Sequence, residues 1–434
     1  MEIANKKKPG SEHGFAENDM VLKWNQIASD ALKNRFAPPI ESRAFAMIQV
    51  SVHDALNSIK PKYKRYALLN AREKNASPDA AVATAAYYTS LSVVPAAQTA
   101  LLAAYNESMN SIPEGEPKTL GITLGKMAAD AIIAKRADDG FALASINPPP
   151  FPADGTVPGV YKSTIPFSNP GAPKVKALYQ WAKYMKPFGV LSNDQFRPGP
   201  PYGELNPPDA VKTTGYTEDY HEVKTLGNKG TNTRTAEQSE IAVFWVESTT
   251  IGWNRFTRNA MMNKKLDAWK TARLFALQHM SEADAYSGIF DAKYYYNFWR
   301  PETAIREGDA DGNTSTTGDA GWIPMFPDLP PAPFITPPIP DYPSGHATAG
   351  GASATILRLF FGTDKTLVNQ TSETLPGISR TYTSFSKAAR DNSLSRIYVG
   401  YHFRLACLVG EEHGTNVASY IFNNNLQENN HDDD

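Results

Sequence analysis

The stretch ESRAFAMIQVSVHDALNSI, residues 41–59, shows the pattern that dominates the chain. Its apolar residues recur every three or four positions, at Phe45, Ile48, Val52, Ala55 and Ile59. This spacing places them on one face of an α-helix, which must then pack against other elements. The stretch therefore predicts a core-facing amphipathic helix.

The same patterning extends along most of the 434 residues. Helices are predicted near residues 20–32, 79–106, 119–137, 235–248, 260–280, 281–299, 345–361 and 384–426. We find no strong period-two alternation and no internal repeat, which argues against a β fold or a solenoid. The sequence predicts an all-α fold of helical bundles, with two four-helix-bundle-like cores.

Proline and glycine interrupt the helices in two long segments, 146–210 and 307–343, which we interpret as Pro-rich loops. We expect a single all-helical domain at residues 20–426, with its functional site in residues 290–406. Residues 1–19 and 427–434 are polar and are predicted to be disordered.

Composition narrows the class of protein. The hydrophobic fraction is 41%, the charged fraction is 20%, and no apolar run is long enough to cross a membrane. A net charge of -2 lacks the footprint of a nucleic-acid-binding protein. The single cysteine, Cys407, excludes disulfides within the chain. Because the chain as a whole is not basic, any anion site must be a local concentration of positive charge.

Two cations stand in DAKYYYNFWRPE, residues 291–302. Lys293 and Arg300 are seven residues apart, close to two helical turns, so a helix would present both on one face. Pro301 disfavours helical geometry at Arg300 and is expected to end the helix there. The alternative is an ordinary solvated basic face.

A helix start is predicted in DYPSGHATAGG, residues 341–351. Ser344 can act as N-cap, and Gly345 lets an anion approach the free backbone N–H groups. His346 would then lie beside that anion, where it can donate a proton. An incidental histidine on a capped helix is the alternative.

The last cluster lies in SLSRIYVGYHFRLAC, residues 393–407. Arg396 and His402 are six residues apart, with Gly400 between them to permit a break in the helix. Arginine offers a planar fork for phosphate-like oxygens, and histidine can be a ligand or a nucleophile. Together the three clusters supply cations and histidines for one oxyanion site.

These clusters, KxxxxxxRP from Lys293, PSGH from Pro343 and SRxxxGxH from Ser395, resemble the tripartite signature of the vanadium-dependent haloperoxidases. Type 2 phosphatidic acid phosphatases and bacterial class A acid phosphatases share that signature and fold. Residues 41–59 are also similar to the N-terminal helices of the haloperoxidase branch.

The resemblance implies a vanadate cofactor, with phosphate able to occupy the same site in its absence. The residues expected to bind the oxyanion are Lys293, Arg300, Ser344, Gly345, Arg396 and His402. Among them, His402 would be bound to the central atom, as the metal ligand in a peroxidase or the nucleophile in a phosphatase. The catalytic residues implied are His346, as acid–base partner at the apical oxygen, His402, and Lys293, which would polarise bound peroxide.

Haloperoxidase chemistry, the oxidation of halide by hydrogen peroxide to hypohalous acid, is the preferred function because of the chain length and the N-terminal helices. The alternatives are a metal-independent acid phosphatase with a phosphohistidine intermediate and a non-catalytic anion binder. The expected partners are hydrogen peroxide and halide. The resemblance implies a secreted, periplasmic or cell-envelope location, and a homodimer is left open.

Two departures from the family pattern concern the site. Many members place an aspartate four residues after the second histidine to orient its ring, where this chain has Ala406, so Glu411, Glu412 or a backbone carbonyl must take over. The resemblance places the halide pocket at Phe290, Trp299 and Ile339. Because Ile339 replaces an aromatic residue or histidine of relatives, we expect iodide or bromide over chloride.

Overall fold

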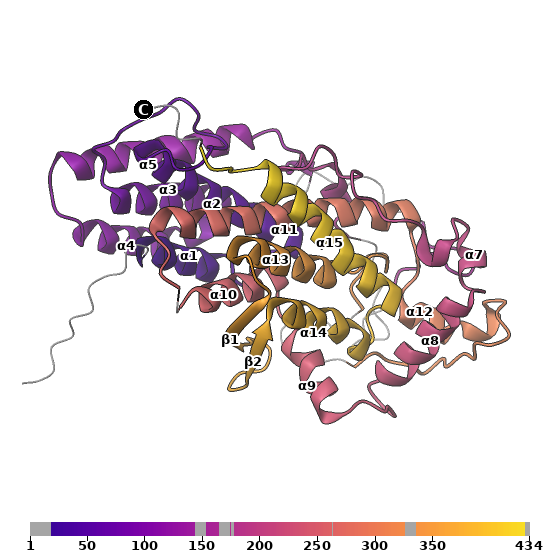
Figure 1. Ribbon diagram of the computed structural model, residues 1–434. Coiled ribbons are helices and arrows are strands. Elements are labelled where there is room, and N and C mark those ends of the chain that lie inside the picture. The colour runs from indigo at the N-terminus through magenta and orange to yellow at the C-terminus, as the bar shows by residue number, and fades with distance from the viewer. Residues whose placement is uncertain are drawn as a thin grey trace, which may run out of the picture.

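The computed structural model describes residues 19–143, 153–164, 174, 178–262, 264–325 and 336–429. The ends that the sequence predicts to be disordered therefore lie largely outside the described residues. Figure 1 shows an elongated body, with the first helices at one end and the loops around α7, α8 and α12 at the other. Within the described residues no helix is both long and apolar enough to cross a membrane.

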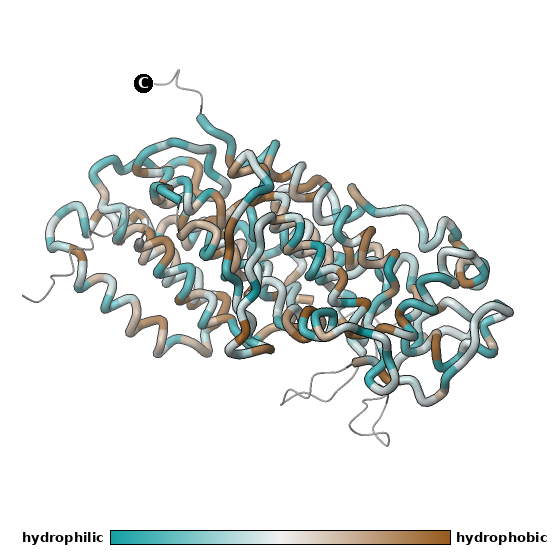
Figure 2. The backbone as a smooth tube through the Cα atoms, turned by 60° about the horizontal axis from the view of Figure 1, so that its bottom comes forward, coloured by the Kyte–Doolittle hydropathy of each residue, from teal (hydrophilic) through white to brown (hydrophobic). Residues whose placement is uncertain are grey.

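The first helices form one packed group. They are α1 (Asp19–Leu32), α2 (Pro38–Ile59), α3 (Pro78–Val93), α4 (Gln98–Asn110) and α5 (Glu116–Lys135). The apolar face predicted for residues 41–59 is buried, and α2 is enclosed on most sides because α3, α5 and α11 all pack on it. Brown and teal alternate along the long helices in Figure 2, as expected where one face packs and the other meets water.

One long helix, α11 (Ala268–Tyr296), joins this group to the second. It packs against α2, α13 and α15, and most of its residues are buried. The predicted division into helices at 260–280 and 281–299 is wrong, because α10 (Thr249–Met261) ends earlier and α11 continues without a break through residue 281. It ends at Tyr296, and its C-cap Asn297 has a left-handed φ of 47°.

The second group contains α11, α13 (Gly345–Phe361), α14 (Phe385–Tyr398) and α15 (Arg404–Asn424). The single helix predicted at 384–426 is divided between α14 and α15, and Gly400 lies in the break with a φ of 84°. Strands β1 (Lys365–Thr371) and β2 (Ser379–Ser384) form an antiparallel hairpin that was not predicted. The hairpin is a small addition, and the predicted all-α fold class is confirmed.

The remaining elements are shorter than the helices of the two groups, and several of them lie in or beside the Pro-rich segments. They are α7 (Pro207–Ala210), α8 (Thr214–Leu226), α9 (Ala236–Phe244), α12 (Pro301–Arg306) and the 3-10 turns η1 (Pro95–Ala97), η2 (Gln180–Tyr184), η3 (Pro201–Gly203) and η4 (Gly308–Ala310).

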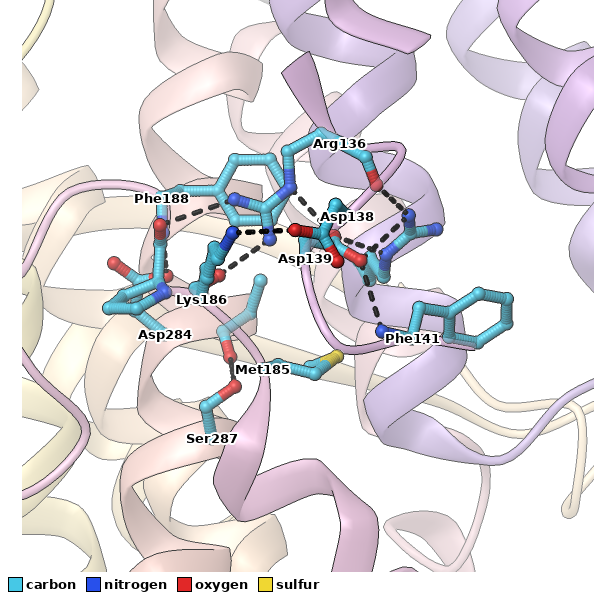
Figure 3. Close-up of polar contacts among 12 residues, drawn as sticks. Arg136, Asp138, Asp139, Phe141, Met185, Lys186, Phe188, Asp284 and Ser287 are labelled. Atoms are coloured by element: carbon cyan, nitrogen blue, oxygen red, sulfur yellow. Dashed lines mark hydrogen bonds and ion pairs between the residues drawn. The ribbon is translucent and has the colours of Figure 1, made fainter. Parts of the chain in front are cut away.

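Buried charges hold one Pro-rich loop against the two helix groups (Figure 3). The carboxylate of Asp284 on α11 accepts backbone N–H groups from Phe188, Gly189 and Val190 at 2.5, 2.7 and 3.0 Å. Arg136, at the end of α5, donates to the Lys186 carbonyl at 2.6 Å and lies over the Phe188 ring. The loop after η2 is therefore fixed to both α5 and α11.

Glycines let α13 and α15 cross with their backbones in close contact. A Cβ added at Gly414 would lie 2.0 Å from the Thr348 carbonyl oxygen, and one at Gly351 would lie 2.2 Å from that of Glu411. Because backbone atoms cannot rotate away, neither position accepts a side chain without displacing a helix. This crossing fixes the start of α13 against α15.

We expect Gly414→Ala to lower the free energy of unfolding by roughly 1–3 kcal/mol, because the added methyl overpacks the crossing. Chemical denaturation followed by circular dichroism measures the loss. Gly199→Ala is the control, since a Cβ there meets nothing within 4 Å. An unchanged midpoint for Gly414→Ala would show that the helices do not approach this closely.

Glu41, near the start of α2, gives a pH-dependent prediction. Burial raises the pKa of its carboxyl from 4.5 to about 8, although the Ser248 hydroxyl donates to it. Because the folded-state pKa is above the unfolded one, the folded protein holds the proton more tightly between these values, and stability falls as pH rises through that window.

The free energy of unfolding of wild type, relative to Glu41→Gln, should therefore drop between about pH 5 and pH 8, by up to roughly 4 kcal/mol. Denaturation curves of both proteins across this range measure the difference. Glu107→Gln, at an exposed ion pair with Lys23, should not show this drop. A constant difference between wild type and Glu41→Gln would disprove the effect.

Candidate active site

The end of α11, the start of α13 and the turn between α14 and α15 enclose a cavity of about 240 Å³. One part of its wall is polar and is formed by Lys293, Arg300, Gly345, His346, Arg396 and His402. The rest is largely apolar and is formed by Pro38, Pro39, Tyr179, Tyr286, Ile289, Phe290, Pro337, Pro338 and Ile339. The structure thus brings the five predicted cations and histidines into one cavity.

Lys293 and Arg300 reach this cavity differently from the prediction. Because α11 ends at Tyr296, Arg300 lies in the connection that leads into α12, and Pro301 begins that helix. The ammonium of Lys293 donates to the carbonyls of Pro340 and Asp341 at 2.8 and 2.9 Å. Both cations are fully buried, and the chain reversal after α11, rather than a shared helix face, brings them together.

Arg300 is anchored by backbone carbonyls at two of its nitrogens. Its Nε donates to Ile339 at 2.8 Å and its Nη1 to Tyr401 at 2.8 Å. Its Nη2 has no hydrogen-bond partner in the described part of the chain. The guanidinium is therefore fixed in place with one donor group left to bind something else.

The start of α13 has the predicted form. Ser344 is the N-cap, and its side chain accepts from the Ala347 N–H. Ser344 is fully buried and does not line the cavity, whereas Gly345 and His346 do. Backbone carbonyls of Val246 and Glu247 hydrogen-bond His346, and its Nε2 has no partner among the described residues. One ring nitrogen of His346 is thus held by the protein and the other is left free.

Arg396 and His402 lie on the two sides of the break between α14 and α15. Gly400 is required there, because its φ is 84° and a Cβ would lie 2.6 Å from the Gly227 carbonyl oxygen. Nη1 of Arg396 donates to the Trp245 carbonyl at 3.4 Å, while its Nε is without a partner in the described ranges. The break turns both side chains toward one point, as the sequence predicted.

The cavity carries an excess of buried positive charge. Burial lowers the pKa of Lys293 well below its ordinary value, aided by Arg300, and lowers that of Arg396 to about 10. Burial and the neighbouring arginines also hold the pKa of both cavity histidines well below 6.5. A bound anion would relieve this repulsion and supply the missing hydrogen-bond acceptors.

Asp341 is the functional residue that the sequence reasoning missed. Its Oδ1 lies 2.8 Å from Nδ1 of His402, and both side chains are buried. Glu411 instead pairs with Arg390 at 3.3 Å, and Glu412 lines a separate groove, so neither prediction for the orienting carboxylate holds. The signal was present in DYPSGH, where the aspartate precedes His346 by five residues, but that stretch was interpreted only as a helix start.

The three residues of the predicted halide pocket do not lie together. Phe290 and Ile339 line the cavity, but Trp299 does not; it is buried elsewhere, with its backbone N–H donating to the Gly159 carbonyl. Tyr179 and Tyr286 line the cavity without having been predicted. Tyr179 is far from the motifs in sequence, so no local pattern could have placed it there. Tyr286 precedes Lys293 by seven residues on α11, and the same helical spacing could have indicated it.

The fold and the site define an all-α protein with a buried cavity lined by cations and histidines. Residues 273–430 match the family model of the VCPO second helical-bundle domain. The vanadium chloroperoxidase of Curvularia inaequalis is 25% identical over 487 aligned residues, covering 89% of this chain and 78% of that protein.

Solved structures share the fold. The first bacterial vanadium-dependent iodoperoxidase to be solved superposes with a TM-score of 0.76 at 23% identity, covering 95% of this chain and 96% of its own. A bacterial vanadium-dependent chloroperoxidase in its apo form gives a TM-score of 0.70 at 15% identity, covering 94% and 98%. Residues 273–430 are thus similar to a domain of the vanadium chloroperoxidases, and the solved vanadium-dependent haloperoxidases share the fold of this chain.

Removing one cation should weaken anion binding sharply. We expect Arg396→Gln to lower the affinity for vanadate and for phosphate by about 30-fold or more, because a buried charge-assisted contact is typically worth 2–5 kcal/mol. Isothermal titration calorimetry measures both affinities.

The matched control is Arg390→Gln, six residues earlier on α14, where the side chain is 45% exposed and pairs with Glu411. It should bind both anions as wild type does. Equal losses in the two variants would mean that the effect is general to α14 and not a property of the cavity.

Proposed function

We propose that this chain is a vanadate-dependent haloperoxidase, which oxidises halide with hydrogen peroxide to hypohalous acid. The observation that carries the proposal is the convergence of Lys293, Arg300, Arg396, His346 and His402 on one small cavity. A site for a bare metal cation would need several carboxylate, thiolate or imidazole ligands, and the described residues contain no such cluster. Cationic side chains around an imidazole can instead bind the negatively charged oxygens of a metal oxyanion, while the imidazole binds its central atom.

The protein groups fit vanadate by their chemistry. Free donors at Arg300 Nη2 and Arg396 Nε can hold its oxygens, as can the backbone at Gly345 on the start of α13. His402 offers the ring nitrogen expected to bind the central atom. Bound vanadate supplies a Lewis-acidic centre that activates peroxide without a change in its own oxidation state.

The other residues hold charge and move protons. Lys293 is fixed by two backbone carbonyls and adds positive charge where negative charge develops. His346 lines the cavity and its Nε2 has no protein partner in the described ranges, which suits it to accept a proton and return it. The low pKa of this ring keeps it neutral and able to accept until an anion is bound.

The apolar part of the cavity supports iodide or bromide over chloride. Phe290, Ile339 and Tyr179 surround this end, with the rings of Tyr179 and Phe290 6.0 Å apart. A large, weakly hydrated halide loses less solvation energy in such surroundings than chloride does. It is also the more easily oxidised.

An acid phosphatase is the second candidate, and one contact favours it. A nucleophilic histidine needs an orienting group, and Asp341 lies 2.8 Å from His402 Nδ1. The absence of a carboxylate at Ala406 therefore does not argue against phosphoryl transfer. Vanadate resembles the trigonal-bipyramidal transition state of that reaction, so one cavity can serve either chemistry.

One comparison decides between the two functions. The purified protein is assayed with vanadate, hydrogen peroxide and each halide, and separately, without vanadate, with a chromogenic phosphate monoester. We expect halide oxidation only after vanadate loading, with kcat/KM falling from iodide to bromide to chloride and with phosphate competing for the site.

His402→Ala should reduce halide oxidation at least 100-fold, while His221→Ala, which alters an exposed histidine bonded to the Ser315 carbonyl, should not change it. Ester hydrolysis that vanadate inhibits, without halide oxidation, would assign the phosphatase function instead. If the protein shows neither activity but still binds vanadate or phosphate, it is a non-catalytic anion binder.

We also propose a secreted, periplasmic or cell-envelope location, for which the family resemblance is the support. The same holds for assembly into a homodimer.

A further inference from the structure

We propose that Asp341 is the positioning residue for His402, fixing its imidazole as the tautomer that carries the proton on Nδ1 and directs the lone pair of Nε2 into the cavity. The inference rests on the proposed function only where it takes His402 as the ligand of the oxyanion's central atom. The tautomer itself follows from contacts within the protein.

The arginine beside His402 leaves the in-plane lone pair of Nε2 unused. Nη1 of Arg300 lies 3.0 Å from His402 Nε2 and 3.4 Å from Nδ1. Because the in-plane directions of the two ring nitrogens diverge, a donor this close to both lies over the face of the ring. The lone pair of Nε2, which lies in the plane of the ring, therefore remains available to the cavity.

The other ring nitrogen, Nδ1, lies beside a carboxylate group, which in its ionised form can only accept hydrogen bonds. Oδ1 of Asp341 lies 2.8 Å from Nδ1, whereas it lies 3.9 Å from Nη1 of Arg300. The carboxylate therefore lies closer to the imidazole of His402 than to the guanidinium of Arg300. A carboxylate at Nδ1 is the general means by which proteins fix a ligand histidine and raise the basicity of its other nitrogen.

The backbone of Asp341 is itself held in place by the site. Its N–H donates to the Phe298 carbonyl at 2.8 Å, and its own carbonyl accepts from Lys293 Nζ at 2.9 Å. Its side chain is buried. A single residue thus fixes one cation through its carbonyl and the key imidazole through its carboxylate, and a shift of this segment would disturb both.

Asp341 also explains how the chain tolerates Ala406. Where many relatives approach the ring from α15, four residues after the histidine, this chain approaches it from the segment that precedes α13. Ala406 is buried, and its carbonyl accepts the backbone N–H of Ser344. The orienting carboxylate has moved to another element, in DYPSGH, while the contact with the ring is preserved.

The test measures the tautomer directly and does not depend on activity. Full-length protein with 15N-labelled histidine, free of vanadate, is examined by NMR, with His402→Gln identifying the resonances of His402. We expect wild type to show a protonated Nδ1 and an unprotonated Nε2 at neutral pH. Asp341→Ala should shift the ring toward a mixture of tautomers.

Vanadate affinity, measured on the same proteins by calorimetry, should fall about 10- to 100-fold in Asp341→Ala. Asp341→Asn retains an acceptor oxygen without the charge, and should fall between the two. Glu411→Gln, which removes a carboxylate on α15 that pairs with Arg390, is the matched control and should leave tautomer and affinity unchanged. Circular dichroism verifies folding, and Asp341→Asn carries the test if Asp341→Ala does not fold.

Retention of the wild-type tautomer in both Asp341 variants, with vanadate affinity within twofold of wild type, overturns the inference. A tautomer that changes with Asp341 in a protein that does not bind vanadate supports the positioning role and refutes the proposed function. Failure of the positioning inference can therefore be distinguished from failure of the proposed function.

Discussion

The arrangement depends on positive charge that the protein buries and does not fully neutralise. Lys293, Arg300 and Arg396 lie in the interior, and Asp341 is the carboxylate closest to them among the described cavity contacts. Such a cluster is unfavourable by itself, since like charges repel and burial removes their hydration. It is maintained by backbone carbonyls, which hold the cations in place with partial negative charge and leave chosen donors free for a tetrahedral anion.

The helical scaffold supplies the rigidity that this requires. Glycines at the crossing of α13 and α15 let backbone meet backbone, which fixes the start of α13 against the segment that carries His402. The loop after η2 is held by Asp284 and Arg136, and Tyr179, just before η2, joins the apolar wall from a distant part of the chain. Packing thus sets the positions of groups whose own charges would drive them apart.

The sequence predicted the parts of the molecule that local chemistry determines. Periodicity located most helices, and Ser344 and Gly400 marked a cap and a break that the structure contains. What it missed depends on tertiary contacts: α11 continues through residue 281 because neighbours bury it, and the hairpin β1–β2 has too few inward residues to show alternation. The placement of Trp299 outside the cavity and of Asp341 against His402 depends on chain reversals that no spacing rule encodes.

The cavity also shows why sequence motifs alone leave peroxidase and phosphatase chemistry unresolved. Both need a cationic cradle and an imidazole whose lone pair faces the central atom, and the same contacts provide both requirements. The difference must then lie outside the shared motifs, in the part of the wall that meets the second reactant. Here that part consists of Phe290, Ile289, Ile339, two tyrosines and prolines. Its hydroxyls are those of Tyr179 and of Tyr286, and the latter is already bonded to Thr249, so the wall offers little to a phosphate ester but accommodates a polarisable halide. The apolar wall, rather than the oxyanion site, is therefore the feature that favours haloperoxidase chemistry in this chain.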